Sequence, residues 1–173
     1  PISFSHPRLL PLSESIELAL SLITPGFPYS FDDENEYLCQ YSRSAFGLTH
    51  RKAGWDCFRH VEILAAGAVP LMPDVERIPR FSMIHYPKSA MKAVLETFEA
   101  TGRVPDVTTR AEFRRYFLAN LTTSAMARYM LRMASVDMGS RVIFFDEHTP
   151  TDPEYLSTLS LIGLKELLGD RCD

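Results

Sequence analysis

The chain has 173 residues, enough for one well-buried core but short of two full domains. Hydrophobic residues make up 46% and charged residues 23% of the sequence, which excludes a disordered or fibrous protein. The net charge of −4 gives no reason to expect nucleic-acid binding. No apolar run approaches the roughly 20 residues that a membrane-spanning helix needs, so no membrane span is predicted.

The predicted elements of the first half alternate between strands and helices. Hydrophobic periodicity and turn residues predict strands at 2–5, 29–31, 44–49 and 68–72, and helices at 13–23, 34–41 and 56–66. The helix at 13–23 is based on Ile16, Leu18, Leu20 and Leu22 among acidic residues. Gly67 is expected to end the helix at 56–66 in the left-handed conformation.

The second half is predicted to be richer in helix. We expect a strand at 83–86, a helix at 89–100, a helical region at 109–134 and a strand at 141–146. Residues 109–112 have the capping-box pattern. Residues 151–154 are predicted to cap a last helix that reaches Leu168 and ends at Gly169.

Alternating strands and helices favour parallel pairing, so the predicted fold is α/β: a three-layer α/β/α sandwich with a mainly parallel, Rossmann-like sheet. We expect this domain to cover residues 1–138. Residues 139–173 would form either the start of a second α/β domain or a return element that packs on the first. Ligands of such sheets bind at the carboxyl ends of the strands, which are followed here by the loops at 5–8, 50–56 and 73–79.

The most informative segment is 44–71, where a predicted strand leads through a basic loop into a predicted helix. The helix N-terminus offers unpaired amide groups and a partial positive charge to a phosphate. Gly54 would let the backbone approach closely, and Arg51, Lys52 and Arg59 could add charge-assisted hydrogen bonds to a diphosphate. Glu62, about one and a half turns inside the helix, could accept hydrogen bonds from a ribose.

This segment resembles the donor-binding, C-terminal half of GT-B-fold glycosyltransferases, and it is similar to exostosin-like and family 1-like members. The resemblance is carried by Ser44, Phe46, Gly54, Arg59, Glu62, Gly67, Pro70 and Asp74. It implies a nucleotide-sugar donor, with Glu62 on the ribose and Arg59 or Lys52 near the diphosphate. It also implies that no metal and no other cofactor is needed, because the helix terminus and basic side chains neutralise the leaving diphosphate.

The sequence departs from the family pattern in two respects. Many members have a second glutamate eight positions before the one on the ribose; Gly54 stands there in this chain, with Asp56 as the nearest acid. The acceptor-binding half that usually comes first is absent, so we expect further domains of a longer chain.

The other candidate site residues have competing interpretations. Trp55 could stack on a nucleobase or pack at the helix start, and Ser5 and Arg8 could contact phosphate. His6 is a candidate for a general base. Three histidines, His50, His60 and His85, are expected to be structural or on the surface. Three unpaired cysteines favour a reducing compartment, and we expect a cytoplasmic protein.

We therefore expect a glycosyltransferase part that binds a nucleotide-activated sugar, with transfer to the hydroxyl of a glycan or another acceptor. The first alternative is a non-catalytic nucleotide-sugar-binding or scaffold domain, which the glycine at position 54 favours. The second is a receiver-type interaction module, supported only by Asp146 and Glu147 after an apolar run.

Overall fold

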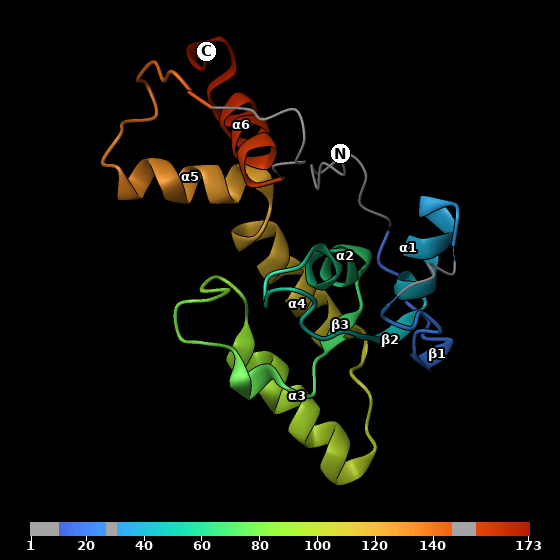
Figure 1. The fold of residues 1–173 in the computed structure, drawn as a ribbon. Helices are drawn as coiled ribbons and strands as arrows, with labels where there is room; N and C mark the ends of the chain where they lie inside the picture. Colours follow the sequence, from blue (N-terminus) through green and yellow to red (C-terminus); the bar gives the residue numbers. More distant parts are fainter. Residues whose placement is uncertain (1–10, 27–30, 147–154) are drawn as a thin grey trace. The chain divides into compact units, whose positions relative to one another are not determined.

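The computed structural model describes residues 11–26, 31–146 and 155–173 (Figure 1). It is an α/β structure with a three-stranded parallel sheet, and the chain divides into two compact units between Phe117 and Leu118. The boundary expected between residues 138 and 139 lies inside the second unit. The predicted strand at 2–5 and the predicted cap at 151–154 lie outside the described residues, as do Tyr29 and Ser30.

The sheet of the first unit has the strand order β1-β2-β3, with β1 at Leu18–Leu20, β2 at Ser44–Leu48 and β3 at Val69–Leu71. Leu20 of β1 is aligned with Phe46 of β2, which is aligned with Val69 of β3. Both pairs are parallel, so the loops after all three strands leave from the same edge. The central strand β2 is almost entirely buried.

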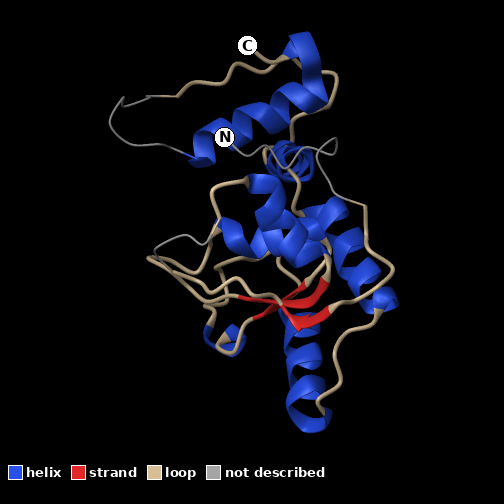
Figure 2. Ribbon diagram, turned by 90° about the vertical axis from the view of Figure 1, so that its right-hand side faces the viewer, coloured by secondary structure: helices blue, strands red, loops and turns tan. Residues whose placement is uncertain are grey.

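Helices lie on both faces of this sheet (Figure 2). On one face, the backbone of Gly47 comes so close to Ile63 of α2 (Phe58–Ala66) and Tyr41 of α1 (Glu34–Ser42) that a Cβ atom would lie 2.8 Å from each. On the other face, the ring of Phe46 meets the ring of Phe98, from α3 (Lys88–Thr101), at 5.1 Å between centroids. Alternating side chains of β2 thus contact opposite helical layers.

Local chemistry explains where α1 and α2 begin and end. The Asp33 side chain accepts a hydrogen bond from the backbone amide of Glu36, which caps α1. Gly67 ends α2 with φ of 89°, a conformation that favours glycine. The predicted helices at 34–41, 56–66 and 89–100 and the predicted strands at 44–49 and 68–72 are confirmed, with small shifts of their ends.

The predicted helix at 13–23 is wrong, because this segment contains β1 and no helix. Its apolar residues Ile16, Leu18, Leu20 and Leu22 recur every second position, and this period suits a strand. The amides of Glu17 and Leu18 donate to the carbonyl of Arg43, and the amide of Ser21 donates to that of Phe46. The apolar residues at every second position were therefore the correct signal for a strand, and the acidic residues that suggested the start of a helix were misleading.

The predicted strand at 83–86 is also wrong, because this segment forms turns. Met83 has φ of 49°, which strand backbone does not adopt, and the amide of Tyr86 donates to the Met83 carbonyl at 3.0 Å. Phe31, at the end of the predicted strand at 29–31, lies outside any strand.

The predicted helical region at 109–134 consists of two helices, α4 at Val107–Asn120 and α5 at Thr123–Met133. Thr109 does not cap α4. Instead, the carboxylate of Asp106 accepts a hydrogen bond from the backbone amide of Thr109 at 2.8 Å, at the start of the helix. The helical region is interrupted at Thr122, because the Thr122 hydroxyl accepts a hydrogen bond from the backbone amide of Ala125 and so caps the start of α5.

A fully buried arginine holds the amino-terminal side of the sheet together. The Arg110 guanidinium donates to the carbonyl of Gly67 at 2.7 Å, of Ser42 at 2.5 Å and of Ser13 at 3.2 Å. The first two carbonyls lie at the C-terminal ends of α2 and α1, where the helix dipole favours a cation. The three bonds join segments that precede all three strands.

The second unit is built on α5 and α6 (Tyr155–Leu168), followed by the 3-10 helix η3 at Gly169–Arg171. Its core contains Ala127, Leu131, Leu164, Leu168 and Cys172. Arg141–Asp146 does not form the predicted strand; within it Val142 makes one isolated parallel bridge to Cys172, while Phe145 is 88% exposed. A strand needs a partner along its length, and here the backbone bonds between the two segments involve only Val142 and Phe144 on one side and Arg171 and Asp173 on the other among the described residues.

Candidate functional site

The candidate site lies at the carboxyl edge of the sheet, where the chain passes from β2 into α2. Between these elements runs the basic loop 50–56, which is predominantly exposed. Cys57 is the N-cap residue of α2, and its side chain makes no capping hydrogen bond. Trp55 and Asp56, which the sequence placed at the helix start, therefore come just before it.

His60, in the first turn of α2, organises this end of the helix. It is fully buried, its Nδ1 lies 2.8 Å from the Thr49 hydroxyl, and its Nε2 lies 2.8 Å from the Trp55 carbonyl. Because a carbonyl only accepts, Nε2 carries the proton and Nδ1 accepts from Thr49. Burial lowers the pKa of His60 and so favours the neutral ring, whose two hydrogen bonds hold the loop against the end of β2.

Around His60 lie several buried polar atoms that have no hydrogen-bond partner among the described residues. They are the Nε of Arg59, the Oδ1 of Asp74 and the hydroxyl of Tyr86. The Tyr86 ring meets the His60 ring edge-on, with centroids 6.0 Å apart, and the charges of Arg59 and Asp74 both act on the pKa of His60. Since a buried polar group without a partner costs about 1–3 kcal/mol, such a group of them is typical of a place where a ligand supplies the missing partners.

Glu62, the predicted ribose ligand, is half-buried between α2 and α1. Its Oε2 accepts a hydrogen bond from the Tyr37 hydroxyl at 2.7 Å, while its Oε1 has no partner among the described residues. Burial raises the pKa of Glu62, and the Tyr37 hydrogen bond and the positive charge of Arg59 act against this rise. One oxygen is therefore held by the protein and the other is available to a ligand.

Arg59 lies in the same polar cluster as Glu62. Burial raises the pKa of Tyr41, and both the charge of Arg59 and a hydrogen bond to it lower that pKa. The Tyr41 hydroxyl is 3.4 Å from that of Tyr37, so Arg59, Tyr41, Tyr37 and Glu62 form one connected cluster between α1 and α2.

The remaining predicted site residues of the loop are exposed, except Trp55, which is half-buried. The Arg51 guanidinium lies 5.5 Å from the centre of the Trp55 ring, a cation–π contact. Lys52 is exposed, and so is Gly54, where a Cβ atom would meet nothing within 4 Å and φ is not positive. Neither packing nor backbone conformation requires a glycine at position 54. Ser5, His6 and Arg8 lie outside the described residues.

Cys57 lies next to His60 but is not an activated nucleophile. Its sulfur is 3.3 Å from Nε2 of His60, which already carries a proton donated to Trp55. Burial raises the pKa of Cys57, whereas a nucleophilic thiol needs a lowered pKa or a neighbouring base. The structure thus gives no support for covalent chemistry at this thiol.

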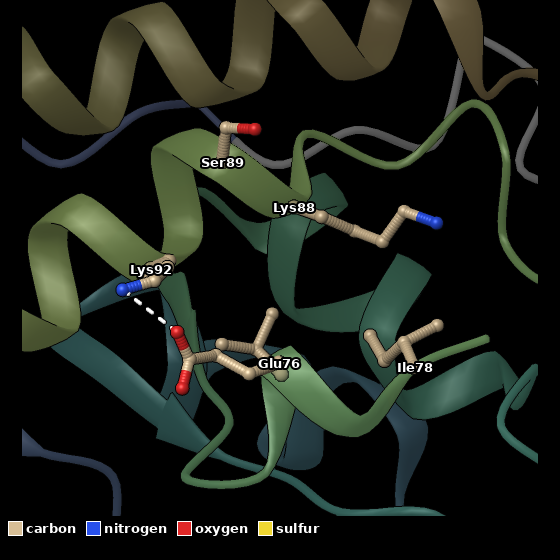
Figure 3. A pocket seen from close by; sticks show the side chains of 6 residues that line it. Glu76, Ile78, Lys88, Ser89 and Lys92 are labelled. Carbon is tan, nitrogen blue, oxygen red and sulfur yellow. Dashed lines mark ion pairs between the residues drawn. The ribbon is translucent and has the colours of Figure 1, made fainter. Parts of the chain in front are cut away.

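A pocket of about 290 Å³ adjoins the loop after β3 (Figure 3). It lies beside the 3-10 helix η2 (Val75–Arg77) and the first turns of α3, and it is lined by Val75, Glu76, Ile78, Lys88, Ser89 and Lys92. Lys92 forms an ion pair with Glu76 at 2.8 Å, and Lys88 donates to the Ser82 carbonyl. None of the site residues predicted from the sequence lines this pocket.

The structure therefore places Arg59 in the first turn of α2 and Glu62 about one turn further along, where the charge of Arg59 acts on Glu62. Asp56, Arg51 and Lys52 are exposed on the loop before the helix. Sequence reasoning missed Tyr37 and Tyr86. A tyrosine in a predicted helix gives no sign of its partner, and Tyr86 lay in a segment assigned wrongly to a strand.

Comparison of the chain with protein-family models, with curated proteins and with solved structures found no match. None of the helices in the described part of the chain is long and apolar enough to cross a membrane. Among the described residues, no three histidine, cysteine, aspartate or glutamate side chains are grouped so that they could hold a metal ion.

Proposed function

We propose that this chain is the donor-binding part of a glycosyltransferase, which binds a nucleotide-activated sugar and presents it for transfer to an acceptor hydroxyl. On this proposal the parallel sheet and its helices are the core of a Rossmann-like sandwich, half of a GT-B architecture. The observation that carries the proposal is the group of buried, unpartnered polar atoms around His60, at the edge of a parallel sheet where ligands bind.

The diphosphate would bind at the N-terminus of α2. The amides there follow an N-cap residue whose side chain does not occupy them, and Arg59 stands in the first turn. Arg51 and Lys52 on the preceding loop would add positive charge as the nucleoside diphosphate leaves. The open space at Gly54 would let the phosphates approach the backbone closely.

The ribose would bind beside Glu62. Its Oε1 can accept from a ribose hydroxyl while Oε2 stays bonded to Tyr37, because a carboxylate oxygen pair offers about four acceptor positions. Acceptor binding and the general base would come largely from elsewhere, which leaves the isolated chain a donor-binding protein with little turnover.

The test is calorimetric titration of the chain with UDP, GDP, dTDP and CMP. We expect one of them to bind, and Glu62→Gln to weaken that binding about tenfold or more, because a hydrogen bond to a charged group contributes about 1.5–3 kcal/mol. Glu99→Gln, an exposed change on α3, serves as the matched control and is expected to have no effect.

A second variant tests whether the ligand approaches the backbone at Gly54, separately from the contribution of the Glu62 side chain. Gly54→Ala is expected to leave the midpoint of thermal unfolding unchanged and to weaken binding of the same nucleotide, because the added methyl group occupies space that only a ligand would use. If no nucleotide of the panel binds the wild-type chain, the donor-binding proposal is wrong and the scaffold alternative is favoured.

A further inference from the structure

Tyr37 of α1 makes the one hydrogen bond from another element that reaches the Glu62 carboxylate among the described residues. The bond is short, 2.7 Å, and joins positions 25 residues apart in the sequence. Burial, followed by the charge of Glu62, raises the pKa of Tyr37 far above its usual range. The raised pKa favours the protonated hydroxyl, which is the donor in this bond.

The Tyr37 ring is held in place independently of this hydroxyl. It meets the ring of Tyr41 edge-on at 5.2 Å and the ring of Phe31 at 6.3 Å between centroids. These contacts persist in phenylalanine, so the hydroxyl can be removed while the packing between α1 and α2 is kept. The orientation of the hydroxyl toward Glu62 thus follows from the aromatic cluster.

Charged and titratable groups face Glu62 from each element that packs against it. Tyr37, Tyr41 and Glu34 approach from α1, Arg59 from α2 itself, and Tyr86 from the segment before α3. Arg59 and Tyr37 favour the ionised carboxylate, while burial and the negative charge of Glu34 disfavour it. Because burial is the largest of these influences, loss of the Tyr37 bond would leave Glu62 protonated over a wider pH range.

We propose that Tyr37 is a positioning residue for donor binding: its hydroxyl fixes the Glu62 carboxylate and keeps it ionised, so that Oε1 faces the ribose of a nucleoside diphosphate. This inference rests on the proposed function and assigns a role to a residue outside the β2–α2 segment. The ribose then meets a carboxylate whose orientation is set before the ligand arrives, which reduces the ordering cost of binding.

The test compares wild type with Tyr37→Phe, using calorimetry with the tightest-binding nucleotide of the panel from pH 5 to pH 8. At pH 8 the variant is expected to bind within about threefold of wild type, because Glu62 is ionised in both. As the pH falls, the ratio of the two dissociation constants should grow, by about tenfold for each unit by which the variant raises the pKa of Glu62. Tyr129→Phe, in the second unit, controls for the loss of a tyrosine hydroxyl and should match wild type throughout.

A second readout needs no ligand: the pKa of the Glu62 carboxyl, followed by NMR of its labelled side-chain carbon, should rise in Tyr37→Phe. A ratio of dissociation constants that is constant with pH, or an unchanged Glu62 pKa, would overturn the role of Tyr37 while leaving nucleotide binding intact. Absence of binding by the wild-type chain overturns both proposals, and the two failures are thereby told apart.

Discussion

At the scale of single residues, the structure divides the polar side chains of α2 into those that build the site and those left open within it. His60 uses both ring nitrogens on the protein, with Thr49 and with the Trp55 carbonyl. Glu62 and Arg59 retain atoms without a partner among the described residues. His60 therefore shapes the loop before α2, and the other two are placed to meet a ligand.

The lowered pKa of His60 predicts a specific loss of stability in acid. In the unfolded chain the ring protonates near its ordinary pKa of 6.5, whereas the folded protein holds it neutral to a lower pH. Its contribution to stability is thus fully present above pH 6.5 and is lost as the pH falls toward the lowered pKa of the folded state.

His60→Asn should reduce the free energy of unfolding at pH 7.5 by about 2 kcal/mol or more, since Thr49 and the Trp55 carbonyl lose a buried partner. The difference from wild type should shrink at pH 5.5, because the variant has no ring to protonate on unfolding. Urea denaturation at the two pH values measures both quantities. An equal difference at both values would mean that His60 does not titrate as described.

Site residues could be predicted where they lie close together in the sequence, and they were missed where packing between distant segments brings them together. Glu62 and Arg59 belong to one segment with the loop and the helix start, so the motif predicted that they lie together. Tyr37 reaches Glu62 only because α1 packs on α2, and the wrong strand assignment concealed the position of Tyr86. Contacts between elements depend on their packing, which the local pattern of a single sequence does not contain.

At the scale of elements, β2 is the part of the chain on which both helical layers depend. Phe46 packs toward α3, and Gly47 allows α1 and α2 to approach the strand on the opposite face. The absence of a side chain at Gly47 thus sets the distance between β2 and the two helices that carry Tyr37 and Glu62.

Gly47→Ala is therefore expected to destabilise the protein by about 1–3 kcal/mol, since its methyl group would lie 2.8 Å from both Ile63 and Tyr41. Gly54→Ala, where the methyl group meets nothing within 4 Å, is the matched control and should stay within about 0.5 kcal/mol of wild type. Thermal or urea unfolding compares the two. A neutral Gly47→Ala would contradict the close packing of α1 and α2 on β2.

The elements that were predicted correctly have signals in their own residues, such as Asp33 before α1 and Gly67 after α2. The errors arose where one local signal outweighed another. The alternation of Ile16 to Leu22 suited a strand despite acidic neighbours, and Thr122 divided what looked like one long helical region. For the apolar run at 141–146, the sequence pattern predicted a strand without showing whether a partner strand exists.

At the scale of the whole molecule, the first unit has a buried arginine on the amino-terminal side of its sheet and the candidate site on the carboxyl side. Arg110 donates to carbonyls that precede each of the three strands, and no carboxylate is hydrogen-bonded to it among the described residues. The carbonyls of Gly67, Ser42 and Ser13 on the amino-terminal side thus have a donor within the protein. On the carboxyl side, buried polar atoms of Arg59, Asp74 and Tyr86 have no partner among the described residues.

Arg110→Met should lower the free energy of unfolding by about 3 kcal/mol or more, because the carbonyls of Gly67 and Ser42 lose a buried donor. Arg110→Lys should recover little of this loss, because an ammonium group lacks the planar fork that reaches several carbonyls at once. Arg115→Met, an exposed change on the same helix, is expected to be neutral. Equal stability of the Arg110 and Arg115 variants in urea would rule out this role.

The first unit is proposed to bind a nucleoside diphosphate at the N-terminus of α2, beside Glu62. The most direct measurement is titration of the ¹⁵N-labelled chain with UDP, GDP, dTDP and CMP while the backbone amide resonances are followed. We expect one nucleotide to cause its largest saturable shifts at residues 54–62, with the amides of α5 and α6 unchanged. Shifts centred on the pocket between Glu76 and Lys92, or no saturable shift with any nucleotide, would contradict it.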